Sequence, residues 1–186
     1  MFRITSLMIG IILLLAACHS PESAPPPSVA TPVRTLEWDE LMPADFEPEA
    51  IFKDVDIASL ADDSPRAQEL MIQLRTLWDA APVVEALDGL RVRLPGFAIP
   101  LEGNGEAVSQ FLLVPFYGAC IHVPPPPANQ TVLVEAATGV TVQIRQAFDT
   151  VWVTGRLAAH RTDTGLAKAG YTLTATKVSP FDVQKR

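Results

Sequence analysis

The sequence of 186 residues predicts a mainly β protein, a small barrel or sandwich, preceded by a partly helical stretch. Three observations predict this fold class. Short apolar runs follow one another at close spacing from residue 83 onward, Gly, Pro, Asn and Asp stand between them as turn signals, and one amphipathic helical stripe lies before residue 82. This combination is typical of small barrels and sandwiches built from short strands.

Residues 1–17 have the pattern of a secretory signal peptide. Arg3 is the basic residue, the apolar run 7–15 is too short to span a bilayer, and small residues follow it. The segment Leu15-Ala16-Ala17-Cys18 resembles a bacterial lipobox, in which the cysteine becomes the lipidated first residue of the mature chain. Cys18 is therefore the predicted lipid attachment site, and the alternative is an ordinary signal peptide with an incidental cysteine.

Residues 18–34 are predicted to be a lipid-anchored, proline-rich tether. Five prolines among Ser and Ala favour an extended segment without a packed core, which would hold the domain off the membrane. His19 follows Cys18, so the aspartate that usually retains such lipoproteins in the inner membrane is absent. This resemblance predicts a periplasmic protein anchored by lipid in the outer membrane.

Residues 35–82 are predicted to form a helical extension. The spacing of Trp38 and Leu41 favours a first helical turn, which Pro43 ends. A longer helix is expected to begin with Ser64 as its N-cap and Pro65 at the first helical position. It would end at Ala81-Pro82 and pack one stripe on the core, made of Leu70, Leu74, Leu77 and Trp78.

Residues 83–186 are predicted to form the β domain. Asp88-Gly89, Pro95-Gly96 and the segment 103–105 are expected to separate its runs, and 111–114 is continuously apolar, as in a central strand. The expected runs are 83–87, 90–94, 97–101, 111–114, 131–134, 140–144, 151–157 and 171–178.

The charge balance argues against a nucleic-acid partner. The chain has 14 Lys and Arg against 21 Asp and Glu, for a net charge of −7, whereas phosphate contacts need basic residues in excess. The acidic residues before the helix lack the Gly spacing of a twelve-residue calcium loop, so they predict a solvated surface and helix capping rather than calcium binding.

The segment 111–130 stands out because it combines a buried strand, a Cys-x-His pair and four prolines. In an extended segment Cys120 and His122 would point to the same face, and both are good zinc ligands. Glu102 and His160 are the candidates to complete a zinc site. Two alternatives stay open: the pair packs without chemistry, or Cys120 is a nucleophile with His122 as its base.

The four prolines after this pair predict a rigid loop, because they lack backbone donors and cannot continue a central strand. The loop would be either a wall beside Cys120 and His122 or a surface offered to a partner. The predicted partner-binding residues are Pro124, Pro125, Pro126, Pro127, Asn129 and Gln130.

The string from Gly118 to Gln130 resembles the signature of the DUF3299 family, whose function is unknown. Leu94-Pro95-Gly96-Phe97 and Val153-Thr154-Gly155-Arg156-Leu157 are similar to its flanking pattern. The resemblance implies an OB-like β-barrel with an N-terminal helical extension, and a secreted or lipid-anchored protein often encoded beside an ABC transporter. Some of those gene clusters respond to zinc shortage. The family has no settled catalytic residues to transfer to this chain.

The sequence thus predicts a helical extension over 35–82 and an OB-like barrel over 83–186. The predicted function is that of a non-catalytic accessory or binding module for an ABC transporter, anchored in the membrane by lipid and possessing no nucleic-acid partner. A zinc-binding module that uses Cys120 and His122, and a thiol enzyme that uses Cys120, are the alternatives.

Overall fold

The computed structural model describes residues 32–103, 108–121 and 123–181, all of which belong to one compact unit. The predicted signal peptide, Cys18, most of the tether and His122 lie outside the described residues. The strands are β1 (Arg34–Thr35), β2 (Arg91–Gly103), β3 (Val108–Val114), β4 (Val132–Ala136), β5 (Asp149–Ala158), β6 (Thr162–Asp163), β7 (Lys168–Ala169) and β8 (Tyr171–Pro180). The helical elements are η1 (Trp38–Leu41), η2 (Pro48–Phe52), η3 (Ile57–Ser59), α1 (Pro65–Asp79), η4 (Glu85–Leu87) and η5 (Ala128–Gln130).

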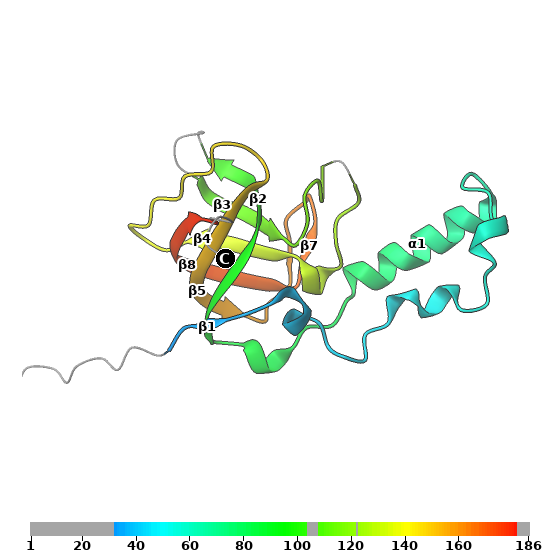
Figure 1. The fold of residues 1–186 in the computed structure, drawn as a ribbon, viewed down its shortest axis with the longest axis horizontal. Helices are drawn as coiled ribbons and strands as arrows, with labels where there is room; N and C mark the ends of the chain where they lie inside the picture. The colour runs from blue at the N-terminus through cyan, green and yellow to red at the C-terminus, as the bar shows by residue number, and fades with distance from the viewer. Residues whose placement is uncertain (1–31, 104–107, 122, 182–186) are drawn as a thin grey trace, which may run out of the picture. The chain divides into compact units, whose positions relative to one another are not determined.

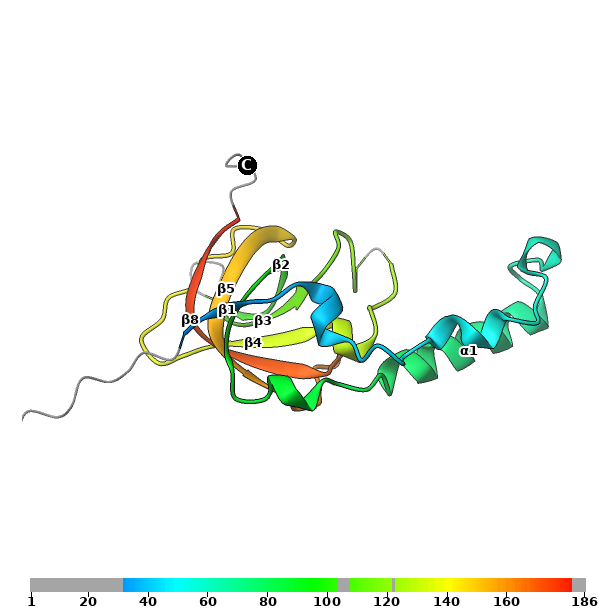
Figure 2. The same cartoon turned by 60° about the horizontal axis from the view of Figure 1, so that its bottom comes forward.

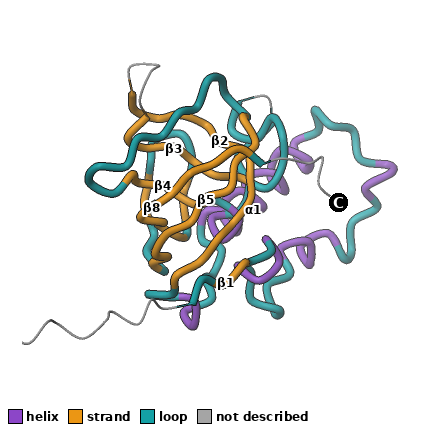
Figure 3. The backbone as a smooth tube through the Cα atoms, turned by 60° about the vertical axis from the view of Figure 1, so that its left-hand side comes forward, coloured by secondary structure: helices purple, strands orange, loops and turns teal. Residues whose placement is uncertain are grey.

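Five strands close into the barrel that the resemblance implies (Figure 1). They pair in the order β2-β3-β4-β8-β5, and β5 pairs back onto β2. Every neighbouring pair is antiparallel except β4 with β8. This closed five-stranded arrangement confirms the predicted mainly β, OB-like fold. Figure 3 shows the strands wrapped around one another beside the helical segments.

One long strand, β2, replaces the two runs that were expected on either side of Pro95-Gly96, so that prediction was wrong. Pro95 is tolerated because its backbone faces away from β5 toward Trp38, whose indole N–H donates to the Pro95 carbonyl at 2.8 Å. A Cβ atom on Gly96 would lie 2.8 Å from Leu113 Cγ and 2.9 Å from the Val114 carbonyl oxygen. The bare backbone of Gly96 therefore lets β3 approach as β2 passes from one partner strand to the next.

The barrel interior is filled by alternating residues of the strands, as a period of two requires. Phe111 and Leu113 of β3 face this core, and Val132 and Val134 of β4 lie in the same cluster. The prediction of a central strand at 111–114 is confirmed, since all four residues have no exposed surface.

Two predicted strand runs are not strands. Residues 85–87 form the 3-10 helix η4, and residues 140–144 have no strand assignment. Burial does alternate along 140–144, because Val142 and Ile144 are buried in the barrel core while Thr141 and Gln143 are exposed. The Val108 N–H of β3 donates to the Val142 carbonyl of this segment at 3.1 Å, and one such bond is not a ladder.

The helical extension begins as predicted, with Ser64 as N-cap and Pro65 in the first turn of α1. The Ser64 hydroxyl accepts from the Ala67 N–H at 3.1 Å. Figure 2 shows the segment containing η2 and η3 running beside α1. The prediction that the apolar stripe of α1 packs on the barrel core was wrong. Leu70 and Leu74 are buried but belong to neither buried cluster of the barrel, and Leu77 is 37% exposed.

The C-terminal end of α1 is held to the barrel by one arginine. The Arg161 guanidinium donates to the carbonyl oxygens of Asp79, Ala80 and Ala81 at 2.5–3.1 Å. These are carbonyls that a helix terminus leaves without helical partners, and a cation is also favourable at this end of a helix. No helix in the described part of the chain is long and apolar enough to cross a membrane.

Candidate functional site

The outer face of β3 and β4 is covered by the protein's own loops. Leu112 and Leu133, which are paired across these strands, point away from the barrel interior and are 0% and 5% exposed. They belong to a second buried cluster that includes Ala119 and Ala169, from the loop after β3 and from β7. OB-folds usually bind oligonucleotides and oligosaccharides on the face around the second and third barrel strands, which are β3 and β4 in this protein. Here that face is filled with apolar side chains.

The loop that covers this face turns sharply at Gly118 and Cys120, where φ is 88° and 66°. The Val123 N–H donates to the Gly118 carbonyl at 3.2 Å and closes the turn. The expectation of an extended segment through Cys120 is therefore wrong, because a positive φ is left-handed backbone. The argument that placed Cys120 and His122 on one face does not hold, and His122 itself lies outside the described residues.

Cys120 is partly buried and packs against the second buried cluster, as Phe97 and Leu101 also do. This burial raises the pKa of the Cys120 thiol to about 11. The thiolate is the form that attacks electrophiles and binds metals, so this environment keeps Cys120 in its unreactive state at neutral pH.

We expect Cys120 to react slowly with iodoacetamide in the folded protein. The pKa rises from 9.0 to about 11, so the thiolate fraction at pH 8 falls by roughly 100-fold. Mass spectrometry of the native protein over a pH series should show alkylation rising toward pH 11, whereas the urea-unfolded protein should react as free cysteine does. Equal rates for the folded and unfolded protein would contradict a buried thiol.

The other predicted zinc ligands do not form a cluster with Cys120 in the described residues. Glu102 lies near the end of β2 and His160 follows β5, and both are exposed. Within the ranges that the structure describes, no group of three or more His, Cys, Asp or Glu side chains could hold a metal ion. Since His122 is not among them, the zinc pair of Cys120 and His122 stays a prediction.

The predicted partner-binding loop divides into an outer and an inner part. Pro124 is exposed, Pro125 and Pro127 are half-buried and Pro126 is buried. Asn129 is fully buried, and its side-chain amide donates to the Pro82 carbonyl at 2.9 Å. Gln130 donates to the Trp38 carbonyl at 2.9 Å. Asn129 and Gln130 therefore bind the two ends of the helical extension, while the prolines supply the outer surface.

The outer surface of this loop forms one wall of an apolar hollow of about 370 Å³, which we call the proline groove. Met71 and Trp78 of α1 form a second wall, and the chain around η2 forms a third. Met71 is 41% exposed and Phe116 is 43% exposed. The lining residues are Met42, Phe46, Pro48, Glu49, Met71, Trp78, Phe116, Val123, Pro124, Pro126 and Pro127. Exposed apolar patches of this kind mark interaction sites in soluble proteins.

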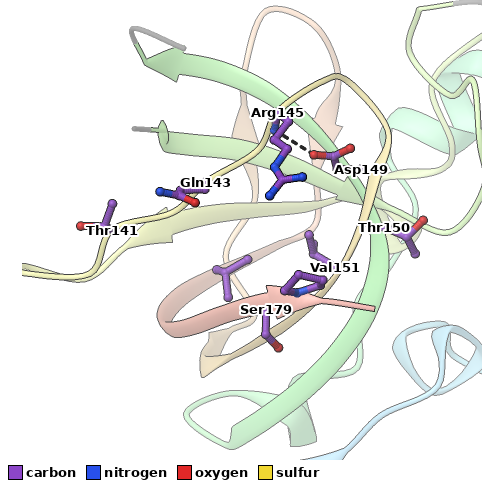
Figure 4. Close-up of a pocket in the computed structure, with 9 residues that line it drawn as sticks. Thr141, Gln143, Arg145, Asp149, Thr150, Val151 and Ser179 are labelled. Atoms are coloured by element: carbon purple, nitrogen blue, oxygen red, sulfur yellow. Dashed lines mark hydrogen bonds between the residues drawn. The ribbon is translucent and has the colours of Figure 1, made fainter. Parts of the chain in front are cut away.

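A second hollow, of about 420 Å³, lies at one end of the barrel and is more polar (Figure 4). Arg145 and Gln143 lie along one side of it, on the segment between β4 and β5, while Ser179 lies on β8. The Asp149 carboxylate accepts from the backbone N–H groups of Arg145 and Gln146 at 2.8 and 3.4 Å. Sequence reasoning missed this hollow, because its residues come from separate segments and match no motif.

The fold and the site define a class of protein: a small OB-like barrel whose usual ligand face is covered and whose covering loop forms an apolar groove with a helical extension. The chain belongs to the DUF3299 family, described as proteins of unknown function, whose model matches residues 38–180. This confirms the family that the sequence resemblance predicted.

The structure is similar to the crystal structure of a DUF3299 family protein from Pseudomonas aeruginosa PAO1, determined at 2.45 Å resolution. The two chains are 37% identical, the match covers 82% of this chain and 99% of that one, and the TM-score is 0.61. No curated protein matches the chain.

Proposed function

We propose that this protein is a non-catalytic periplasmic lipoprotein that acts as a binding module for an ABC transporter, with the proline groove as its protein-binding surface. One observation carries the proposal. The face on which OB-folds usually hold their ligands is closed by Ala119 and Ala169, and the same covering loop presents Phe116 and Pro124 in an open apolar groove. An exposed groove of this chemistry suits a protein partner better than a sugar or a nucleic acid.

The environment of Cys120 supports a non-catalytic role. Burial raises the pKa of this thiol to about 11, whereas nucleophilic cysteines have lowered pKa values and an adjacent base. The side chain packs against the second buried cluster, so filling space accounts for its position.

The cellular part of the proposal rests on sequence. The lipobox-like segment that ends at Cys18 supports lipid anchoring, and the absence of aspartate at position 19 supports the outer membrane. The transporter partner and a role in zinc homeostasis are carried over from the family resemblance. Zinc binding by Cys120 and His122 remains the alternative function.

We expect the proline groove to be needed for association with the membrane subunit of the ABC transporter that is encoded beside this protein. Met71→Glu and Phe116→Glu each place a carboxylate on a half-exposed wall of the groove. Each should reduce recovery of that subunit from detergent-solubilised membranes by roughly tenfold, because the partner would have to desolvate a charge.

Gln143→Glu is the matched control, since it adds the same charge in the polar hollow at the end of the barrel. It should leave recovery unchanged. All three variants should keep the wild-type thermal midpoint within a few degrees. Failure of the wild-type protein to recover the transporter, or equal recovery with all variants, would show that the groove does not bind it.

A further inference from the structure

We infer that the partner docks through a basic amphipathic helix, which lies along the helical extension in an apolar track that continues the proline groove. This inference rests on the proposed function, because it names the chemistry of the partner segment at the same surface. Three features of the extension carry it: the continuity of its apolar surface, the lack of a strand edge along it, and its charge.

The apolar track consists of the proline groove and a neighbouring hollow of about 360 Å³ between α1 and the η2–η3 segment. Met71 lines both hollows, so their apolar surfaces are continuous. Along α1 the lining runs from Ala67 to Trp78, which is about 16 Å at 1.5 Å per residue. This length matches three turns of a partner helix. The second hollow is lined by Phe52, Ile57, Leu60, Asp62, Ala67, Leu70 and Met71.

The walls of the track favour a helical partner over an extended one. They are made of α1, the 3-10 turns η2 and η3, and the loop with Pro124, Pro126 and Pro127. Helix backbone is already hydrogen-bonded, and proline has no N–H, so the track presents no row of free backbone groups for strand addition. A helix satisfies its own backbone and offers an apolar stripe, as in helix-in-groove recognition.

The charge of the extension predicts that this helix is basic. Residues 35–82 contain 12 acidic and 3 basic side chains, a net charge of −9, whereas residues 83–186 contain 8 acidic and 9 basic side chains, a net charge of +1. The acidity of the whole chain is therefore concentrated on the element that carries the track. Such a field attracts and orients a positively charged partner.

Two of these acidic side chains lie at the track without an ion-pair partner in the described chain. Glu49 and Asp62 line the two hollows and are exposed. The basic residues Lys53 and Arg66 pair with other acids, at 3.4 Å to Glu47 and 2.9 Å to Glu69. In the described chain no ion pair involves Glu49 or Asp62. Lysine or arginine side chains of a docked helix would supply those counter-charges.

The same charge opposes the other occupants of an apolar groove. A second copy of the chain would bring two extensions of net charge −9 together. An anionic membrane surface would repel the extension in the same way. The predicted tether, residues 18–34, contains one acid, Glu22, and one basic residue, Arg34, which lies in β1 and pairs with Glu40. It therefore has no free basic residue of the kind that the track calls for.

The test uses the full-length lipoprotein in detergent and three labelled peptide helices of about 18 residues, or five turns. The three peptides share one Leu stripe with i, i+4, i+7 spacing, and their polar faces carry Lys, Gln or Glu. We expect the Leu/Lys peptide to bind roughly tenfold more tightly than the Leu/Gln peptide at low salt, and the Leu/Glu peptide to bind most weakly. Fluorescence anisotropy measures all three.

Charge reversal locates the site. Glu49→Lys with Asp62→Lys should weaken the Leu/Lys peptide by roughly tenfold and strengthen the Leu/Glu peptide. Glu85→Lys with Glu102→Lys is the matched control for charge, because both acids are exposed and lie outside the extension, in η4 and β2. It should leave the order and the affinities of the three peptides unchanged.

The outcomes separate this inference from the proposed function. If the transporter co-purifies through the proline groove but the three peptides bind equally, or the charge reversal changes nothing, the basic helix is wrong and the binding module stands. If sedimentation shows a dimer that Met71→Glu dissociates, the track is covered by a second copy and the inference is overturned. If the peptides bind as expected but the transporter does not co-purify, the basic helix stands and the transporter assignment is wrong.

Discussion

Gly155→Ala is expected to destabilise the barrel by about 3–5 kcal/mol, which would consume a large part of the stability of an ordinary domain. A Cβ atom at position 155 would overlap the Thr174 carbonyl oxygen and lie 2.8 Å from the carbonyl carbon and 3.0 Å from the Ala175 Cα. All three neighbours are backbone atoms of β8, so no side-chain rotation relieves the clash. The ladder between β5 and β8 shifts register between Thr154 and Gly155, and the alanine would push the two strands apart at this bulge.

Urea unfolding followed by tryptophan fluorescence measures the change, with the m-value showing whether the transition stays two-state. Gly139→Ala is the control, because no atom lies within 4 Å of a Cβ built there. Its φ of 83° gives a backbone strain of about 1–2 kcal/mol. If Gly155→Ala lowers the free energy of unfolding no more than Gly139→Ala does, β8 shifts at little cost and the bulge tolerates a side chain.

Two of the long strands were predictable because each carries its own periodic signal. The apolar run at 111–114 and the alternation at 151–157 lie within β3 and β5. The bulge at Gly155 was not predictable, because nothing local shows that the Thr174 backbone of β8 comes against this glycine. The wrong prediction of a turn at Pro95-Gly96 has the same origin. The Pro95 carbonyl accepts a hydrogen bond from Trp38, which is 57 residues away, and no local pattern shows this contact.

The candidate site was predicted in part. The proline loop was correctly identified as an unusual segment, since four consecutive prolines exclude a central strand on local grounds alone. The other two walls of the proline groove could not be foreseen. Met71 of α1 and Pro48 of η2 lie 45 and 68 positions before Phe116 of the covering loop, and no motif links the three. The conformation of Cys120 was equally hidden, because a left-handed cysteine has no sequence signal.

The roles of Asn129 and Gln130 show a further limit. Both were predicted, together with the prolines, to be partner-binding residues. In the structure their side chains bind the carbonyls of Pro82 and Trp38 inside the protein. Residue type could not distinguish a polar side chain that binds a partner from one that binds the protein's own backbone, because the partner atoms lie 47 and 92 residues away.

Tyr171→Phe should cost about 2–3 kcal/mol, although it removes a single oxygen atom. The Tyr171 hydroxyl donates to the Leu41 carbonyl at 2.7 Å and accepts from the Val84 N–H at 2.6 Å. Tyr171 and Leu41 have no exposed surface, so the phenylalanine variant would leave buried backbone groups without partners. Leu41 and Val84 flank residues 42–83, so the variant should also speed proteolysis within that stretch.

Two comparisons isolate the hydroxyl. Thr172→Val removes a neighbouring buried hydroxyl that has no hydrogen-bond partner among the described residues, and it should be neutral or slightly stabilising. Burial raises the pKa of Tyr171, so the folded state favours the protonated hydroxyl. The stability that this hydroxyl contributes is therefore lost as the pH rises above the ordinary tyrosine pKa of about 10. The stability gap between the wild type and Tyr171→Phe should therefore narrow in strongly alkaline solution. A gap that stays constant, or a Tyr171→Phe protein as stable as Thr172→Val, would mean that other contacts hold the extension on the barrel.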